Sequence, residues 1–211
     1  MSPFEELAQF VLSGNAIGVE EQVKQLIKEA VDPREIINQG LIGGMNIVGP
    51  LFKNGEMYVP EVLMSARAMK VGMELVKPLI ADGDMPAIGK VVIGTVKGDL
   101  HDIGKNLVSM MMESAGFAVA NIGVDINPVG FVEAIKKYQP DIVAISALLT
   151  TTMPAIQETI EVFKNEGIRD KIKVIVGGAP VSQEFATKIG ADGFAEDAAS
   201  ATDLCKQLLN I

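Results

Sequence analysis

The chain has a single histidine, His101, and its surroundings suit it to binding a metal. His101 follows a β-branched apolar run at 91–96 and precedes a helix-like stretch at 106–115. It therefore lies on a strand-to-helix loop, where open α/β sheets keep their ligand sites. Asp99, two residues upstream, can accept a proton from one ring nitrogen while the other nitrogen faces a metal. The alternative is a surface histidine with acidic neighbours.

Other loops after predicted strands carry residues that could bind a ligand at the same edge. Residues 146–153 include four hydroxyl side chains, whereas a helix N-cap needs one. Gly177 and Gly178 end the next strand, where they serve either a ligand's close approach to the backbone or a tight turn. Residues 194–200 follow the last strand. In a parallel sheet these loops would share one edge with His101.

The second half of the chain alternates apolar strands with helices. We expect strands at 90–96, 117–124, 141–148, 173–176 and 193–195, with helices at 106–115, 128–138, 154–166 and 182–189 and a last helix after them. Alternating units of this length require a parallel sheet with helices on both faces. The prediction is an α/β fold: a flavodoxin-like (Rossmann-type) five-stranded sheet in the order 2-1-3-4-5, with its switch point between strands one and three.

The first half reads as a four-helix bundle. Ser2, followed by proline and by glutamate at the third helical position, is a helix-start signal, and Asp32 repeats it. Glycines at 40, 43 and 44 interrupt the third helix, and close packing against a neighbour would explain them. We expect a loop at 51–59, a last helix at 60–78, and a linker and hinge at 82–86. The predicted domains are 1–86 and 87–211.

Composition excludes some classes of partner and location. The 211 residues carry a net charge of -9, which argues against nucleic acid and anionic membranes as partners. No apolar run reaches membrane-spanning length, and the N-terminus lacks signal-peptide character. The single cysteine, Cys205, is expected to be a core or half-buried thiol. A cytoplasmic protein is the simplest interpretation.

Three motifs in order along the chain resemble those of a known family. They are Asp-x-His-x-x-Gly at 99–104, Ser-x-Leu-x-Thr at 146–150 and Gly-Gly at 177–178. Together they resemble the cobalamin module of methionine synthase and the corrinoid proteins of methyltransferase systems. The resemblance covers nearly the whole chain, because residues 54–66 are similar to the family's helical cap motif. It implies an N-terminal four-helix cap over a cobalamin-binding domain.

The resemblance also implies roles for single residues. His101 would be the axial ligand of the cobalt in cobalamin, held as methylcobalamin or another corrinoid. Asp99 would accept the ring's other N–H, and Thr152 would complete that relay. Met57 and Tyr58 would form an apolar lid. Ser146 and Thr150 would bind the nucleotide tail of the cofactor, and Gly177, Gly178 and Ala198 would line its channel. The remaining cofactor-binding residues would be Gly98, Leu100, Asp102, Ile103, Gly104 and Leu148, with Asp102 also expected to cap the helix that follows it.

The function that follows from the resemblance is methyl transport in one-carbon metabolism. The protein, not catalytic alone, would carry a methyl group between a substrate-specific methyltransferase and a second one with a folate or thiol acceptor, and a reductive activase would serve it. The donor would be a methylamine, betaine, methanol or an aryl methyl ether. Three alternatives stay open: a cobalamin-sensing regulator, the small subunit of a B12-dependent mutase, and a flavodoxin-like domain that binds flavin or nothing.

Overall fold

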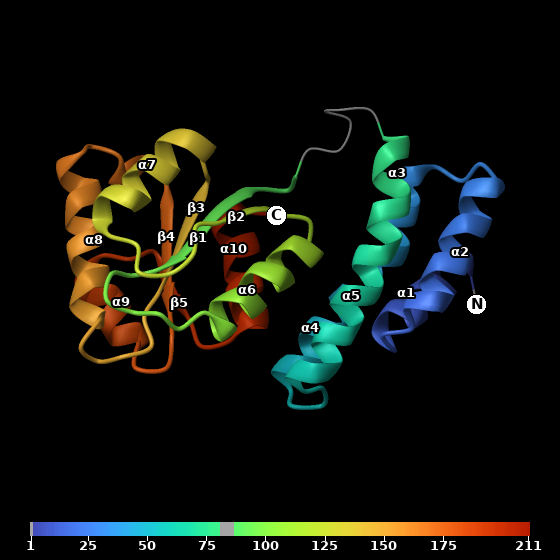
Figure 1. Cartoon of the computed structure of the whole chain (residues 1–211), viewed down its shortest axis with the longest axis horizontal. Coiled ribbons are helices and arrows are strands. Elements are labelled where there is room, and N and C mark those ends of the chain that lie inside the picture. The colour runs from blue at the N-terminus through green and yellow to red at the C-terminus, as the bar shows by residue number, and fades with distance from the viewer. Residues whose placement is uncertain (1, 81–86) are drawn as a thin grey trace. The chain divides into compact units, whose positions relative to one another are not determined.

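The computed structural model describes residues 2–80 and 87–211, which form a helical unit and a sheet-containing unit (Figure 1). The predicted linker at 82–86 lies outside the described residues. None of the helices in the described ranges has both the length and the apolar character needed to cross a bilayer.

The sheet of the second unit is parallel throughout and has the predicted strand order. Its strands are β1 (Lys90–Thr95), β2 (Ala118–Asn121), β3 (Ile142–Ser146), β4 (Lys173–Gly177) and β5 (Gly193–Ala195). They pair in the order β2-β1-β3-β4-β5, which confirms the flavodoxin-like prediction. The central strands are buried along almost their whole length, as expected of a sheet that is covered on both faces.

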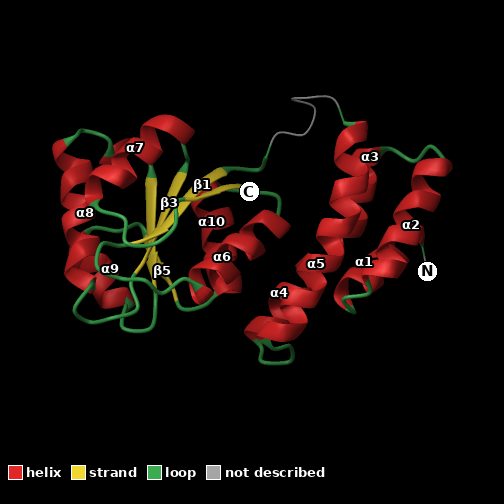
Figure 2. Cartoon of the chain, in the orientation of Figure 1, coloured by secondary structure: helices red, strands yellow, loops and turns green. Residues whose placement is uncertain are grey.

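Helices cover both faces of this sheet. They are α6 (Ile103–Ser114), α7 (Pro128–Tyr138), α8 (Met153–Asn165), α9 (Gln183–Ile189) and α10 (Ala198–Leu209), with a short 3-10 turn, η3 (Arg169–Lys171), before β4. Figure 2 shows α7, α8 and α9 on one side of the sheet and α6 and α10 on the other. The core under α7 and α8 is closed by Phe131 and Phe163, whose rings meet edge to face at 6.5 Å.

The register of the sheet brings the ends of its central strands level. Thr95 of β1 pairs with Ser146 of β3, Ser146 pairs with Gly177 of β4, and Gly177 pairs with Ala195 of β5. The loops that follow these four strands therefore start at the same edge. This edge is where an open α/β sheet binds its ligand.

The first unit is a small helical bundle. Its elements are α1 (Pro3–Leu12), α2 (Ala16–Lys28), α3 (Pro33–Glu35), η1 (Ile36–Leu41), α4 (Ile42–Lys53), α5 (Val59–Val76) and η2 (Lys77–Leu79). Both predicted start signals cap helices: Ser2 and Glu5 form a capping box on α1, and Asp32 accepts the Arg34 N–H at the start of α3.

Two of the three glycines in the third helix pack against α1. A Cβ added to Gly40 would lie 2.4 Å from the Leu7 side chain, and one added to Gly44 would lie 2.6 Å from Val11. Gly40 falls in η1, a π-helical stretch that joins α3 to α4 without a break. Gly43 has no such neighbour. Close helix packing thus accounts for Gly40 and Gly44 but not for Gly43.

Three predicted boundaries were wrong. Helix α4 runs through Pro50 to Lys53, because Leu51 and Phe52 are half-buried and continue its apolar face. Strand β2 ends at Asn121, because Gly123 and Asp125 turn into left-handed conformations directly after it. Helix α6 begins at Ile103 rather than 106, and its exposed, glycine-containing first turn carries no apolar periodicity.

Candidate cobalamin site

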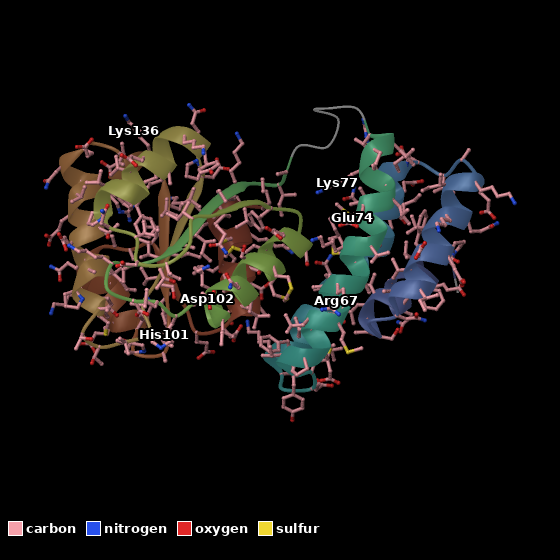
Figure 3. The ribbon with its side chains drawn as sticks, in the orientation of Figure 1. Arg67, Glu74, Lys77, His101, Asp102 and Lys136 are labelled. Carbon is pink, nitrogen blue, oxygen red and sulfur yellow. The ribbon has the colours of Figure 1, made fainter. Side chains whose placement is uncertain are left out.

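His101 lies on the loop between β1 and α6, at the edge of the sheet where the central strands end (Figure 3). Its side chain is about half exposed, whereas Asp99 is fully buried. Nδ1 of His101 is 2.7 Å from Asp99 Oδ1, and the His101 backbone N–H donates to the same oxygen at 3.1 Å. Asp99 therefore fixes both the backbone and the ring of the histidine.

The carboxylate of Asp99 accepts four hydrogen bonds, as many as its lone pairs allow. Besides the two bonds from His101, Oδ2 accepts the Leu148 N–H at 2.7 Å and the Thr152 hydroxyl at 2.8 Å. Burial alone would raise the pKa of Asp99, but the bonds from Leu148, His101 and Thr152 outweigh it and hold the pKa well below the usual range of a carboxyl. The group is a buried, fully satisfied anion.

The ionised carboxylate determines which ring nitrogen of His101 carries the proton. An ionised carboxylate can only accept hydrogen bonds, so the Nδ1 atom that faces Asp99 must donate. The neutral ring then keeps the lone pair of Nε2 available. A histidine whose Nδ1–H is held by a carboxylate is the usual arrangement of a metal-ligating imidazole. The predicted relay from Thr152 through Asp99 to His101 is present as hydrogen bonds.

Thr95, the last residue of β1, holds the β1–α6 loop through the backbone of His101. Its buried hydroxyl donates to the His101 carbonyl oxygen at 3.0 Å. The Thr95 backbone is itself held by the β2–α7 loop, because its N–H donates to the Gly123 carbonyl and its carbonyl accepts the Ile126 N–H, both at 3.0 Å. Sequence reasoning missed Thr95, since a threonine inside an apolar strand reads as an ordinary strand residue.

Exposed apolar side chains surround the histidine. Leu100 is 73% exposed and Ile103 is 82% exposed, and they flank His101 in the chain. Leu148 and Leu149, on the β3–α8 loop that bonds Asp99, are also exposed. A Cβ added to Gly104 would meet nothing within 4 Å. A cluster of exposed leucine and isoleucine around an imidazole is typical of a surface that an apolar ligand covers.

The β3–α8 loop contributes backbone as well as hydroxyl groups. Thr152 is buried, and its hydroxyl is also 2.9 Å from the Leu149 carbonyl oxygen. Ser146, at the end of β3, is half-buried, and Thr150 is exposed. Both lie on the same edge as His101, but no hydrogen bond joins either side chain to the Asp99 network. Their predicted role toward the nucleotide tail stays a prediction.

The paired glycines after β4 meet neighbouring backbone. A Cβ added to Gly178 would lie 1.9 Å from the Ala147 carbonyl oxygen, and one added to Gly177 would lie 2.9 Å from the Ala195 carbonyl oxygen. The close approach that these glycines allow in the structure is therefore between adjacent strand ends. Ala198, the first residue of α10, is buried, with its carbonyl accepting the Thr202 hydroxyl. A channel lined by these residues stays a prediction.

A second polar network joins α6 to the end of β2, and the sequence did not point to it. Lys105 is buried, and its Nζ donates to Asn106 Oδ1 at 2.6 Å and to Asn121 Oδ1 at 2.7 Å. Burial lowers the pKa of Lys105, against the effect of the Asp102 charge. Asp102 precedes α6, and its side chain accepts from the Asn106 side-chain amide at 3.0 Å. Its expected role as a helix cap stays a prediction.

The predicted lid residues lie in the helical unit, just before α5. Met57 is buried within that unit at 9% exposure, whereas Tyr58 is 69% exposed. The Tyr58 backbone N–H donates to Glu61 Oε2 at 2.8 Å, which caps α5. On the first turns of α5, Val62 is buried but Leu63 is exposed. Tyr58 is thus the more accessible of the two predicted lid residues.

Comparison with known proteins shows the family to which the chain belongs. Residues 89–203 match the B12 binding domain family, and residues 3–77 match a second family that is also described as a B12 binding domain. Dimethylamine corrinoid protein 1 of Methanosarcina acetivorans is 46% identical over 206 residues, which cover 97% of this chain and 96% of that protein. A corrinoid protein of Desulfitobacterium hafniense is 44% identical and covers 99% of this chain and 98% of its own length.

Two solved structures share the whole fold. The methanol:cobalamin methyltransferase complex of Methanosarcina barkeri matches with a TM-score of 0.88 and 31% identity over 99% of this chain and 80% of that chain. A cobalamin-binding protein of Desulfitobacterium hafniense matches with a TM-score of 0.82 and 32% identity over 97% and 98% of the two chains. The fold and the histidine site define a protein with a B12-binding domain. The chain belongs to the family of B12-binding corrinoid proteins, and its cofactor is a cobalamin.

The residues present fit such a cofactor. Cobalt is a transition metal, and an imidazole nitrogen is a suitable protein donor for such a metal. Nε2 of His101 can serve as that donor, since Asp99 holds the proton on Nδ1. The exposed side chains of Leu100, Ile103 and Leu148 offer an apolar surface to a large flat ring.

Proposed function

We propose that this chain is a methyl carrier, which holds cobalamin through His101 and presents it to one methyltransferase that loads a methyl group and to another that removes it. The observation that carries the proposal is how His101 is held. Nδ1 is 2.7 Å from an oxygen of buried Asp99, and the lone pair of Nε2 is left available for a metal. The bound cofactor supplies the cobalt that accepts and releases the methyl group. The chain supplies orientation, a tuned axial nitrogen and access.

The Asp99 network gives the axial nitrogen its character. A carboxylate on Nδ1–H makes the opposite nitrogen a better donor and keeps the ring in one orientation. The Leu148 N–H and the Thr152 hydroxyl hold the carboxylate in place independently of its bond to the histidine. The low pKa of Asp99 favours a proton on Nδ1 over one on the carboxylate.

The other site residues complete the proposal. Gly98, Leu100 and Leu148 lie on loops near His101, and Ile103 and Gly104 lie in the first turn of α6. These five residues would contact the corrin. The nucleotide tail would be accommodated by Ser146, Thr150, Gly177, Gly178 and Ala198. Met57 and Tyr58 would shield the upper face of the cofactor. The cap domain that carries these two residues would span 1–86, and the cobalamin-binding domain would span 87–211. Support comes from the high exposure of Leu100 and Ile103 and from the shared edge of the strand ends.

The partners follow from the role of a carrier. A substrate-specific methyltransferase would load the methyl group, a second one with a folate or thiol acceptor would remove it, and a reductive activase would restore oxidised cofactor. The relatives named for dimethylamine make dimethylamine the first methyl donor to test. A net charge of -9 supports protein partners over nucleic acid or an anionic membrane. A cytoplasmic location stays a prediction.

The ligand assignment can be tested directly because the chain has one histidine. Untagged protein, made once with ordinary histidine and once with ¹⁵N-histidine, is loaded with hydroxocobalamin, desalted and reduced to the cobalt(II) state. In the electron paramagnetic resonance spectrum, the axial-nitrogen splitting should change from a triplet to a doublet with the label. The His101→Ala variant should lose the dependence on label. If the splitting in the unmodified protein stays a triplet with ¹⁵N-histidine, His101 is not the ligand.

Carrier function needs a second measurement. The loaded protein is reduced to the cobalt(I) state with a chemical reductant and mixed with dimethylamine and a dimethylamine-specific methyltransferase, and the corrin absorbance is followed for methylation of the cofactor. Methanol, betaine and an aryl methyl ether, each with its own methyltransferase, form the other arms. Methylation in any arm supports a carrier. A protein that retains only adenosylcobalamin and takes a methyl group in no arm would point to the mutase alternative.

A further inference from the structure

Asp125, on the β2–α7 loop, has an unusual backbone conformation beside the histidine loop. Its φ is 56°, in the left-handed region that non-glycine residues seldom adopt, although aspartate tolerates it better than most. The side chain is exposed and lies in none of the motifs that point to cobalamin. A left-handed residue next to a binding loop is a place to look for a functional constraint.

Asp125 makes two hydrogen bonds to adjacent residues of the histidine loop. Its carboxylate Oδ1 accepts the Gly98 N–H at 2.7 Å. Its own backbone N–H donates to the Asp99 carbonyl oxygen at 3.0 Å. The two bonds run in opposite directions, so Asp125 holds the backbone on both sides of the Gly98–Asp99 peptide bond.

Leu148 and Thr152 hold the far oxygen of the Asp99 carboxylate, but the backbone at Gly98 has few contacts of its own. Gly98 has a φ of 82°, is exposed, and a Cβ added to it would meet only Thr152 Cγ2 at 3.7 Å. The direction of the Asp99 side chain depends on this backbone, because Asp99 is the next residue. Asp99 in turn holds Nδ1 of His101. A shift at Gly98 would therefore reach the imidazole through one side chain.

We propose that Asp125 is a positioning residue for the axial histidine: by holding the Gly98–Asp99 turn it keeps the Asp99 carboxylate on Nδ1 of His101 and so strengthens the bond from Nε2 to cobalt. The inference rests on the proposed function for its consequence at cobalt, but its first link, from Asp125 to His101, exists without a cofactor. The competing explanation is a turn residue, for which only the left-handed backbone matters.

Substitution separates these explanations, because glycine adopts the left-handed conformation freely. Asp125→Gly keeps the turn and the backbone donor but removes the carboxylate. Asp125→Asn keeps an uncharged acceptor, and hydrogen bonds to uncharged groups are weaker. Gln139→Gly is the matched control, since Gln139 is also exposed and left-handed, with a φ of 47°, at the end of α7.

Two readouts follow His101 itself. In the cofactor-free protein, ¹⁵N-histidine NMR measures how fast the Nδ1–H proton exchanges with water. In the protein loaded with hydroxocobalamin and reduced, the ¹⁵N-dependent part of the paramagnetic resonance spectrum measures the ratio of histidine-bound to histidine-free cobalt. For Asp125→Gly we expect exchange to rise about tenfold and the ratio to fall about tenfold, the effect of losing one charge-assisted hydrogen bond. For Asp125→Asn we expect about a threefold change in both, and for Gln139→Gly none.

Thermal unfolding of each variant shows whether it is folded before it is measured. Exchange and ratio equal to the unmodified protein in Asp125→Gly would overturn the proposal and leave Asp125 as a turn residue. Should Asp125→Gly not fold, Asp125→Asn decides, and unchanged exchange in that variant overturns it. Unmodified protein that takes up no cobalamin would defeat the proposed function instead, while the NMR measurement still tests the link from Asp125 to His101.

Discussion

The Thr152 hydroxyl oxygen lies 2.8 Å from Asp99 Oδ2, although 53 residues separate the two in the chain. Thr152 ends the β3–α8 loop and Asp99 lies on the β1–α6 loop, so this bond joins the loops of two adjacent strands. At the switch point of the sheet, between β1 and β3, a hydrogen bond from Thr152 thus reaches the residue that holds His101. The predictions below test this network and the fold that supports it.

The proton on the His101 ring should sit on Nδ1 in the cofactor-free protein. Asp99 is ionised and buried, and it can hold the ring only as an acceptor. Nitrogen-15 NMR of histidine-labelled protein, recorded at a pH where the ring is neutral, should show a protonated Nδ1 and an unprotonated Nε2. One histidine in the chain makes the assignment direct. A spectrum of the opposite tautomer would contradict the network.

Asp99→Asn should destabilise the protein by about 3 kcal/mol, because an amide nitrogen would replace one of two oxygens that accept buried hydrogen bonds and would face another donor. Urea unfolding measures the change. The matched control is Asp141→Asn, since Asp141 is exposed and accepts one backbone N–H, from Lys90 at 2.8 Å. The control should cost about 1 kcal/mol or less. Equal costs at the two positions would argue against a special role for the buried carboxylate.

Gly178→Ala should cost about 3 kcal/mol or more, because it adds strain to a steric clash. Gly178 has a φ of 121°, and its new Cβ would lie 1.9 Å from the Ala147 carbonyl oxygen. Gly167→Ala is the control, with a φ of 66° and nothing within 4 Å of an added Cβ. That change should cost about 1 kcal/mol, the backbone preference alone. Similar midpoints in thermal unfolding for both variants would contradict the tight packing of the β3 and β4 ends.

Stability should fall above pH 9 because of Cys205. The thiol is fully buried, and burial raises the pKa of Cys205 to about 12 from a usual value of 9.0. Above pH 9 the unfolded chain loses the thiol proton while the folded chain keeps it, so the folding free energy contributed by the neutral thiol declines as pH rises.

The size of this effect is about 1.4 kcal/mol per pH unit between pH 9 and the raised pKa. Urea unfolding of the unmodified protein and of Cys205→Ala, at several pH values from 8 to about 11, measures the difference in slope. The variant should be less stable at pH 8, from the lost sulfur, but less sensitive to alkali. Parallel curves would mean that the thiol is not held neutral in the fold.

The sequence predicted the sheet well because periodicity and turn residues agree there. Helix α7 begins and ends as predicted at 128 and 138, since Pro128 starts it and an apolar face runs to its end. The strand order followed from the alternation of elements and was confirmed. The start of α6 was missed because Ile103 and Gly104 are exposed in its first turn, so local packing carried no signal.

The sequence likewise indicated some residues of the candidate site and missed others. The spacing of His101 and Asp99 indicated a candidate metal site, with a surface histidine as the alternative, and the resemblance to the family supplied the role of Thr152. Thr95, Lys105 and Asp125 could not be predicted, since their importance depends on which loops meet across β1 and β2. Their bonds to His101, Asn121 and Gly98 each span the β1–α6 loop or its neighbours in space. The Lys105 and Asp125 contacts follow only from the three-dimensional arrangement, because they join segments 16 and 27 residues apart.

The attachment of His101 to Thr95 has a consequence for specificity. The histidine's carbonyl is tied to the last residue of a central strand, and that strand is itself clamped by Gly123 and Ile126. The sheet therefore supports the backbone of His101 from the Thr95 side, while Asp99 holds its ring. A carrier that meets several enzymes would then present His101 to each of them in the same position. Selection among partner enzymes would then depend on surfaces away from the histidine. The residues of those surfaces can change without altering the residues that hold His101.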